Sequence, residues 1–285
     1  GDCCLILGVV RHSVGDFEEA DSNFRRSLKI REDLRDLVGI ASALNNLGNL
    51  SSDRGRYGEA DECYRRSFEL RAKIGHMEGM SAALVNRGNV AFNGGRYEDA
   101  RQHYDEALAL AERIGSAYTA AFARLNLART LYRMGETGGA MELLLTVQGD
   151  AARRGFQDLQ CAASAVLAVV CLAQRNLVAA EVRARESLEM ARAMDSKFYR
   201  ALALRALGQV LTAKGDRESG VAALLESLNL FEEMKAEHEA AKTCAELSKA
   251  ESDWDKANAY RNRAQAVFER LGAMGDLGRL GAKPD

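Results

Sequence analysis

Small residues return along this chain at a fixed interval of 40 positions. One register holds a residue no larger than alanine six times in succession: Gly8, Gly48, Gly88, Ala128, Ala168 and Gly208. A second register, twelve positions further on, does the same: Ala20, Ala60, Ala100, Ala140, Ala180 and Gly220. A small residue at a fixed interval marks a point where two helices approach closely. Each unit is therefore predicted to be a pair of helices that meet at these two positions.

A turn signal separates the two registers in every unit. It reads Gly15-Asp16, Gly55-Arg56, Gly95-Arg96, Gly135-Glu136, Arg175-Asn176 and Gly215-Asp216. Glycine or asparagine at this point supplies the left-handed residue that ends a helix. Over residues 17 to about 34, apolar residues then follow near helical spacing, at Ala20, Phe24, Leu28 and Ile30. The pattern predicts an all-α chain in which helix, sharp turn and helix repeat.

About seven such hairpins account for nearly the whole chain, as one elongated stack over residues 1–271. The predicted units are residues 1–40, 41–80, 81–120, 121–160, 161–200, 201–240 and 241–271. The seventh lacks three residues, and the glycines beyond it predict a flexible tail over 272–285. In the fourth unit, Gly149-Asp150 predicts a local irregularity. The first unit lacks the linker that precedes later units, so we expect the sequence to be an excerpt of a longer protein.

The second and third units are the most alike, and they carry a resemblance to a known family. Arg56-Tyr57-Gly58-Glu59-Ala60 is echoed by Arg96-Tyr97-Glu98-Asp99-Ala100, and Tyr64 by Tyr104. Leucine, glycine, alanine and an aromatic residue at the seventh, eighth, twentieth and twenty-fourth positions resemble the tetratricopeptide repeat, whose usual period is about 34 residues. The longer 40-residue form is similar to repeats in Partner of Inscuteable scaffolds, kinesin light chains and bacterial signalling proteins. The resemblance implies a right-handed superhelical solenoid of antiparallel helical hairpins with a concave partner-binding groove.

Composition and charge narrow the range of partners and compartments. The chain is 47% hydrophobic and 28% charged, and its 39 basic and 41 acidic residues are distributed through every unit. No basic stripe stands out, which argues against nucleic acid, and no long uncharged apolar run indicates a membrane span. Cysteines occur without CxxC or Cys/His metal-ligand spacing, at Cys3, Cys4, Cys63, Cys161, Cys171 and Cys244. They are interpreted as free thiols in a reducing compartment, the cytoplasm.

Catalytic signatures are missing from the sequence. It contains no phosphate-binding glycine loop followed by Lys-Ser/Thr, no HExxH and no GxSxG. The four histidines fall on different registers of the repeat, and the acidic clusters Glu232-Glu233 and Glu237-His238-Glu239 are interpreted as solvated helix faces. We therefore expect no enzyme activity, no catalytic residue, no cofactor and no metal.

Asparagines on the first helix of successive units are the candidate binding residues. Asparagine is a mediocre helix former, so its return at fixed positions needs a reason, and its amide can both donate to and accept from a peptide backbone. In the resembling families such a ladder holds an extended peptide. Alternatively, these amides bond only within the stack. The predicted groove residues are Asn45, Asn46, Asn49, Asp53, Asn86, Asn89, Phe92, Asn93, Asn126, Arg129, Tyr132, Arg133, Arg205 and Gln209.

Two functions from different classes fit this sequence. The first is a protein-interaction module whose groove binds an extended partner segment, with Arg129 and Arg133 offering charge to an acidic side chain. The second is a sensor domain of a larger bacterial ATPase, kinase or transcription regulator, gripping another domain or a small effector. An enzyme similar to repeat-containing phosphatases is a third possibility, but no matching Gln or Glu motif supports it.

Overall fold

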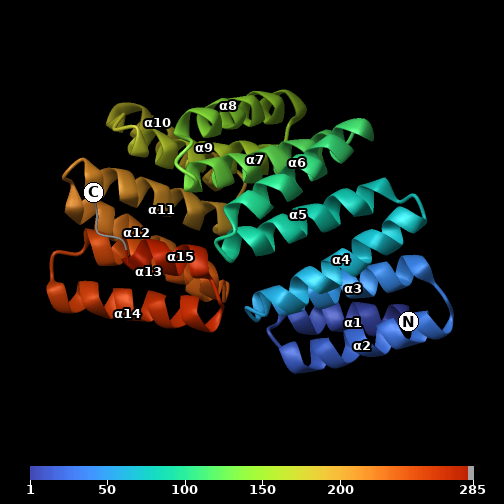
Figure 1. Ribbon diagram of the computed structural model, residues 1–285. Coiled ribbons are helices and arrows are strands. Elements are labelled where there is room, and N and C mark those ends of the chain that lie inside the picture. The colour runs from blue at the N-terminus through green and yellow to red at the C-terminus, as the bar shows by residue number, and fades with distance from the viewer. Residues whose placement is uncertain (282–285) are drawn as a thin grey trace. The chain divides into compact units, whose positions relative to one another are not determined.

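The computed structural model describes residues 1–281. All regular secondary structure in this range is α-helical, which confirms the all-α prediction (Figure 1). Backbone contacts divide the chain into two compact units, unit 1 (Gly1–Ala123) and unit 2 (Arg124–Asp285). The helices are α1 (Asp2–Ser13), α2 (Phe17–Asp33), α3 (Leu37–Asp53), α4 (Tyr57–Lys73), α5 (Met77–Asn93), α6 (Tyr97–Arg113), α7 (Ala117–Arg133), α8 (Thr137–Arg154), α9 (Gln157–Ala173), α10 (Leu177–Ala193), α11 (Lys197–Ala213), α12 (Arg217–Glu233), α13 (Glu237–Ala250), α14 (Trp254–Arg270) and α15 (Met274–Gly281).

A 20-residue rhythm underlies the 40-residue repeat. Helices α2 to α7 each have 17 residues and are joined by three-residue links, both within a hairpin and between hairpins. Each link places one residue in the left-handed region, usually glycine, such as Gly55 (φ 73°) and Gly75 (φ 70°). In the link before α10 we expected Asn176 to take this conformation, but Arg175 does (φ 60°). Asn176 instead caps α10, where its Oδ1 accepts a hydrogen bond from Ala179 N at 3.1 Å.

Three local predictions meet different outcomes. Gly149 does not interrupt α8 as we expected, but α8 has 18 residues and only residues 155–156 separate it from α9, so the local irregularity lies in the link that follows. Helix α13 has 14 residues, so the loss of three residues from the seventh hairpin falls in its first helix. Instead of a flexible tail, residues 274–281 form α15, with Leu280 only 7% exposed, while the rest of that tail, 282–285, lies outside the described residues.

The first small-residue register marks where an aromatic ring fills the space of a missing side chain. A Cβ on Gly48 would lie 2.6 Å from the ring of Tyr64, and one on Gly88 would lie 2.5 Å from the ring of Tyr104. In the fourth hairpin alanine replaces glycine, and Leu144 stands at the position of Tyr64 and Tyr104. In the sixth hairpin, however, Gly208 faces Leu224, and a Cβ on it would also lie 2.9 Å from the backbone oxygen of Gly220. The residue at the eighth position therefore depends on both the facing side chain and the approach of the backbones.

Buried serines tie the two helices of a hairpin together. Ser67 Oγ donates to the backbone oxygen of Ala41 at 2.8 Å, and Ser227 does the same to Ala201. In the third hairpin the roles are exchanged, because Ser81 on the first helix donates to Ala107 on the second. Sequence reasoning missed this tie, although serine recurs at 40-residue multiples in Ser27, Ser67, Ser187 and Ser227.

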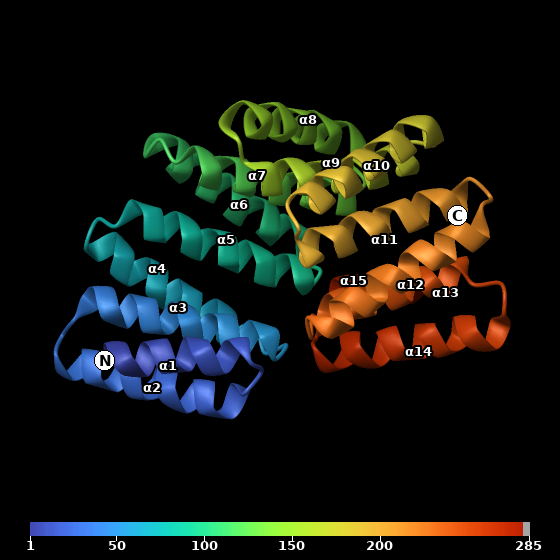
Figure 2. The same ribbon diagram turned by 180° about the vertical axis from the view of Figure 1, so that it is seen from behind.

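The first helices of successive hairpins form one layer in unit 2. Helix α9 contacts α11, and α11 contacts α13, in addition to each helix's own hairpin partner (Figure 2). The second helices, α10, α12 and α14, lie on the other side of this layer. Side chains that α7, α9, α11 and α13 turn away from their partners therefore share one face, which we call the inner face of unit 2.

Candidate functional site

Two half-buried asparagines in unit 1 hold the same arrangement one repeat apart. The hydroxyl of Tyr64 donates to Asn49 Oδ1 at 2.8 Å, and that of Tyr104 donates to Asn89 Oδ1 at 2.7 Å. Burial raises the pKa of Tyr64, so this hydroxyl keeps the proton that it donates. Within the part of the chain that the structure describes, the amide nitrogens of Asn49 and Asn89 have no hydrogen-bond partner. Each tyrosine therefore fixes the amide oxygen and leaves the two N–H donors available.

The other predicted asparagines make bonds within the protein. Asn46 Nδ2 donates to the backbone oxygen of Ser42 at 3.0 Å, and Asn86 Nδ2 donates to Asn45 Oδ1 at 3.2 Å, which links adjacent hairpins. Asn126 is 4% exposed. These are bonds of the kind that the alternative interpretation expects. A role of these residues in binding a partner stays a prediction.

The remaining predicted residues of unit 1 make contacts of their own, although Asp53 is exposed. Asp53 Oδ2 is 2.8 Å from His12 Nε2, and Phe92 is 7% exposed with its ring 5.6 Å from that of Tyr97. Asn93, at the end of α5, is half-buried. The pairs Asn49–Tyr64 and Asn89–Tyr104 are therefore the polar arrangement that repeats in unit 1.

A buried cluster on the inner face of unit 2 joins the first helix of the fourth hairpin to the end of the described chain. Arg133, the last residue of α7, donates through Nη1 to Asp276 Oδ1 at 2.9 Å and through Nη2 to the backbone oxygen of Gly275 at 2.6 Å. From α13, His238 Nε2 lies 2.9 Å from Asp276 Oδ2, and Lys242 Nζ lies 4.0 Å from it. The side chains of Arg133 and Asp276 are 9% and 8% exposed. Three cationic or polar groups thus surround one carboxylate of α15.

A second carboxylate extends this network to α11. Glu239 Oε2 accepts from Arg205 Nη2 at 2.5 Å, and Glu239 Oε1 accepts from Lys242 Nζ at 2.9 Å. The Arg205 guanidinium also lies 5.3 Å from the centre of the Phe231 ring. Our interpretation of Glu237-His238-Glu239 as a solvated helix face is therefore wrong for its last two residues, because α15 and Arg205 cover them. Gln209, on the same helix as Arg205, is half-buried, and its Oε1 has no hydrogen-bond partner among the described residues.

The charges of the cluster fix its protonation. Burial alone would raise the pKa of Asp276, but Lys242, His238 and Arg133 outweigh it and hold that pKa well below its usual range. Burial and Lys242 lower the pKa of His238, which leaves its imidazole neutral at pH 7. An ionised carboxylate can only accept, so the neutral imidazole donates through Nε2. At neutral pH the cluster therefore holds an ionised Asp276 against two cations and a neutral histidine.

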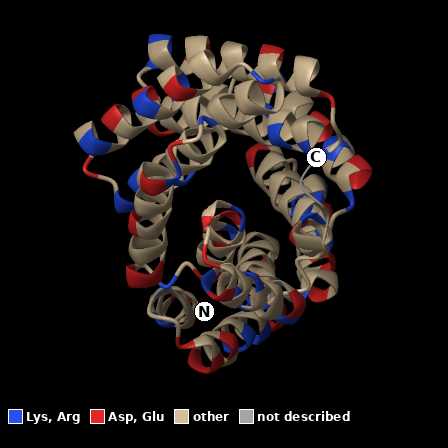
Figure 3. Ribbon diagram, turned by 90° about the vertical axis from the view of Figure 1, so that its left-hand side faces the viewer, with Lys and Arg blue, Asp and Glu red and all other residues tan. Residues whose placement is uncertain are grey.

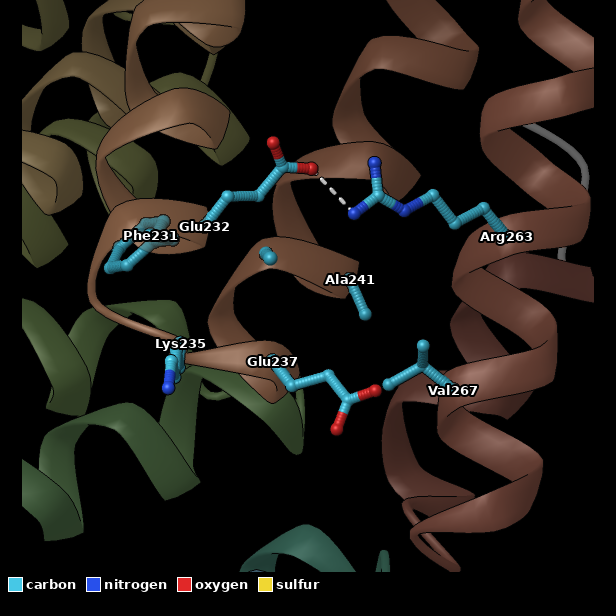
Figure 4. Close-up of a pocket in the computed structure, with 8 residues that line it drawn as sticks. Phe231, Glu232, Lys235, Glu237, Ala241, Arg263 and Val267 are labelled. Carbon is cyan, nitrogen blue, oxygen red and sulfur yellow. Dashed lines mark ion pairs between the residues drawn. The ribbon is translucent and has the colours of Figure 1, made fainter. Parts of the chain in front are cut away.

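A surface pocket of about 300 Å³ lies elsewhere in unit 2, between α12, α13 and α14 (Figure 4). Its floor includes Phe231 and Ala241, and its rim carries Glu232 and Glu237. Glu232 is paired with Arg263 at 2.5 Å, and Glu237 is paired with Arg270 on α14. These two carboxylates are thus already paired with arginines, while Lys235 also lines the pocket.

The wider surface has a mixed charge. Lys and Arg are interspersed with Asp and Glu along the helices of each unit (Figure 3). Within residues 1–281, no group of three or more His, Cys, Asp or Glu side chains is arranged to hold a metal ion. None of the described helices is long and apolar enough to cross a membrane.

The family is shown by the sequence as well as by this architecture. The chain belongs to the MalT-like TPR region family, whose model matches residues 2–230. No curated protein gives a significant sequence match. The family and the paired helices together confirm the predicted tetratricopeptide fold.

Solved structures of other proteins share this fold. A Rap protein complexed with competence and sporulation factor is 15% identical, with a TM-score of 0.79 over 94% of this chain and 74% of that one. The Rap conjugation gene regulator of plasmid pLS20, in complex with the Phr* peptide, is 13% identical, with a TM-score of 0.65 over 87% of this chain and 78% of that one. A signal transduction ATPase with a tetratricopeptide repeat sensor from Pyrococcus horikoshii is 15% identical, with a TM-score of 0.61 over 98% of this chain but only 45% of that one.

Proposed function

We propose that this chain is a non-enzymatic protein-interaction module that binds an extended peptide or partner segment along its first helices. The observation that carries the proposal is the pair of amides in unit 1. Asn49 and Asn89 occupy the same position of adjacent repeats, and a tyrosine holds each with its N–H donors unused. An extended peptide presents backbone carbonyl oxygens at regular intervals, which such donors can bind. Because the amides are already oriented, binding costs little additional side-chain entropy.

The test compares two double variants against a peptide selected from a random library displayed against the whole chain. Asn49→Ala with Asn89→Ala should weaken binding of that peptide about ten-fold or somewhat more, since each bond to a neutral backbone group contributes roughly 0.5 to 1.5 kcal/mol. Asn258→Ala with Asn262→Ala is the matched control on α14, where Asn258 is half-buried and Asn262 is exposed, and it should leave binding unchanged. Helicity is followed for both variants by circular dichroism.

Removing only the tyrosine hydroxyls gives a finer test of the same idea. Tyr64→Phe with Tyr104→Phe keeps both amides but releases them from their fixed orientation. We expect a smaller loss of affinity than with the asparagine variants. If all three double variants bind the selected peptide equally, the amides are not its binding site; if the variant lacking Asn49 and Asn89 loses helicity, these residues stabilise the stack instead.

A second candidate function is a sensor domain of a larger signalling protein. The observation that favours it is the likeness to the Pyrococcus horikoshii ATPase, whose repeat sensor is one part of a multidomain chain. In that case the same surface would bind another domain of the full-length protein or a small effector. Binding of the separately expressed remainder of the full-length protein, lost on Asn49→Ala with Asn89→Ala, would support this second function.

A further inference from the structure

We propose that the inner face of unit 2 contains a carboxylate-binding site for an acidic residue of the partner, and that α15 fills this site from within the chain until the partner displaces it. Arg133, His238 and Lys242 form the site, and Asp276 is its present occupant. This inference rests on the proposed function, because it takes the partner to be a peptide segment.

The geometry is that of a site built to receive a carboxylate with its neighbouring backbone. The Arg133 guanidinium divides its donors between the side chain of Asp276 and the backbone oxygen of the residue before it. His238 donates to the second carboxylate oxygen from another helix. Charge-assisted bonds of this kind are stronger than neutral ones and select an anionic group. The donors come from α7 and α13, so they converge on one point from two different hairpins.

Apart from these bonds, α15 is held by packing against α14 and the core of unit 2. Of the eight residues in α15, Gly275, Gly278 and Gly281 are poor helix formers, and the helix packs chiefly through Leu277 and Leu280. Arg279 lies over the ring of Tyr132 at 5.8 Å, close to the cluster. A short glycine-rich helix gains little from its own backbone, so its position depends on the carboxylate and on these side chains.

The charge balance indicates what an incoming partner must supply. Lys242 is shared between Asp276 and Glu239, while Arg205 neutralises Glu239 from the other side. If Asp276 leaves, Arg133 loses the carboxylate that it now binds, and Lys242 keeps Glu239, which Arg205 also neutralises. Removing a carboxylate from this half-buried cationic site is unfavourable. A segment with an Asp or Glu side chain can take the vacated position, whereas a neutral segment cannot compensate the charge.

The test uses the full chain and an end-blocked, fluorescent peptide with the sequence of Met274–Gly281. In the unaltered protein α15 competes at high local concentration, so this peptide should bind weakly. This peptide should bind to Asp276→Asn roughly ten-fold more tightly than to the unaltered protein. It should also bind to that variant at least about ten-fold more tightly than the same peptide with Asn in place of Asp. Adding Arg133→Gln to Asp276→Asn should remove the preference for the acidic peptide.

A second variant and a second measurement keep the test decisive. Arg279→Ala removes the contact with Tyr132 but leaves the carboxylate and its partners intact, and it should also increase binding of the acidic peptide. Hydrogen exchange should show faster exchange over Met274–Gly281 in both variants, with α9 to α13 unchanged. Equal binding of the two peptides to Asp276→Asn, or full protection of α15 in it, would overturn the proposal. Loss of this site would leave peptide binding through Asn49 and Asn89 untouched, so the two failures are distinguishable.

Discussion

Replacing Gly88 by alanine should destabilise the third hairpin, although alanine is the better helix former. A Cβ on Gly88 would lie 2.5 Å from Tyr104 Cε1 and 2.8 Å from its Cδ1, whereas ordinary contact is 3.4–4 Å. The ring would have to move by about 1 Å, but Tyr104 is 1% exposed and its hydroxyl is bound to Asn89. Overpacking costs about 1 to 3 kcal/mol, against a gain of about 1 kcal/mol in helix propensity. We expect a net loss of up to about 2 kcal/mol.

The fourth hairpin supplies the compensating change. There Ala128 stands at the position of Gly88 and Leu144 at the position of Tyr104, and both are fully buried. Tyr104→Leu alone should cost about 1 to 3 kcal/mol, because it removes ring volume and strands Asn89 Oδ1. Combined with Gly88→Ala it should cost less than the sum of the two single losses, by about 0.5 to 3 kcal/mol.

Urea unfolding followed by circular dichroism measures these differences, with hydrogen exchange of α5 and α6 as a local readout because repeat proteins can unfold in segments. The matched control is Gly149→Ala on α8, where a new Cβ meets nothing within 4 Å and stability should rise. Strictly additive losses, or a Gly88→Ala protein as stable as the parent, would refute the reasoning that the ring requires the glycine.

Two further predictions concern the thiols and the buried carboxylate. Burial raises the pKa of Cys161, Cys171 and Cys244, and it raises that of Cys244 to about 11. These thiols should therefore react slowly with a thiol reagent in the native protein. All six cysteines should react after unfolding without reductant, and fewer than six would reveal a disulfide. Because the folded pKa of Asp276 is lowered, its stabilising effect is complete above its ordinary pKa of about 4 and is lost as the pH falls below it. The difference in urea midpoint between the parent and Asp276→Asn should therefore shrink progressively as the pH falls below about 4, and a constant difference would contradict the assignment.

Periodicity made most of the fold predictable from the sequence. Each hairpin buries its apolar residues against its own partner and its neighbours, so small residues at fixed intervals were enough to locate the helix pairs. Local predictions failed at positions where they were made from the residue type alone, without its position in the helix or link. Gly149 does not interrupt α8, because a single glycine in a helix interior costs only about 1 kcal/mol of helix propensity. Arg175 is the middle residue of its link, the position that is left-handed in the other three-residue links up to α13 too, and Asn176 caps α10.

The candidate sites were less predictable, because they depend on contacts between residues at different repeat positions and on different helices. The orientation of Asn49 and Asn89 is set by tyrosines on the following helix, and the matching 15-residue separation in both repeats was the available signal. The cluster around Asp276 left no such signal. Arg133 lies 143 positions before Asp276, and the glycines of α15 argue locally for a flexible segment. Only the tertiary arrangement brings the two charges together.

The equal links between helices have a consequence for how such a chain can change in length. Each connection from α2 to α7 spans three residues and turns through one left-handed residue, whether it closes a hairpin or joins two of them. The backbone therefore has no special seam at which one repeat stops and the next begins. A 40-residue segment cut at any of these links, for example residues 57–96, carries one helix of each kind and restores the same phase when it is removed or duplicated. Repeats can therefore be gained or lost by recombination at any of these links. The number of repeats can change without one fixed boundary between them.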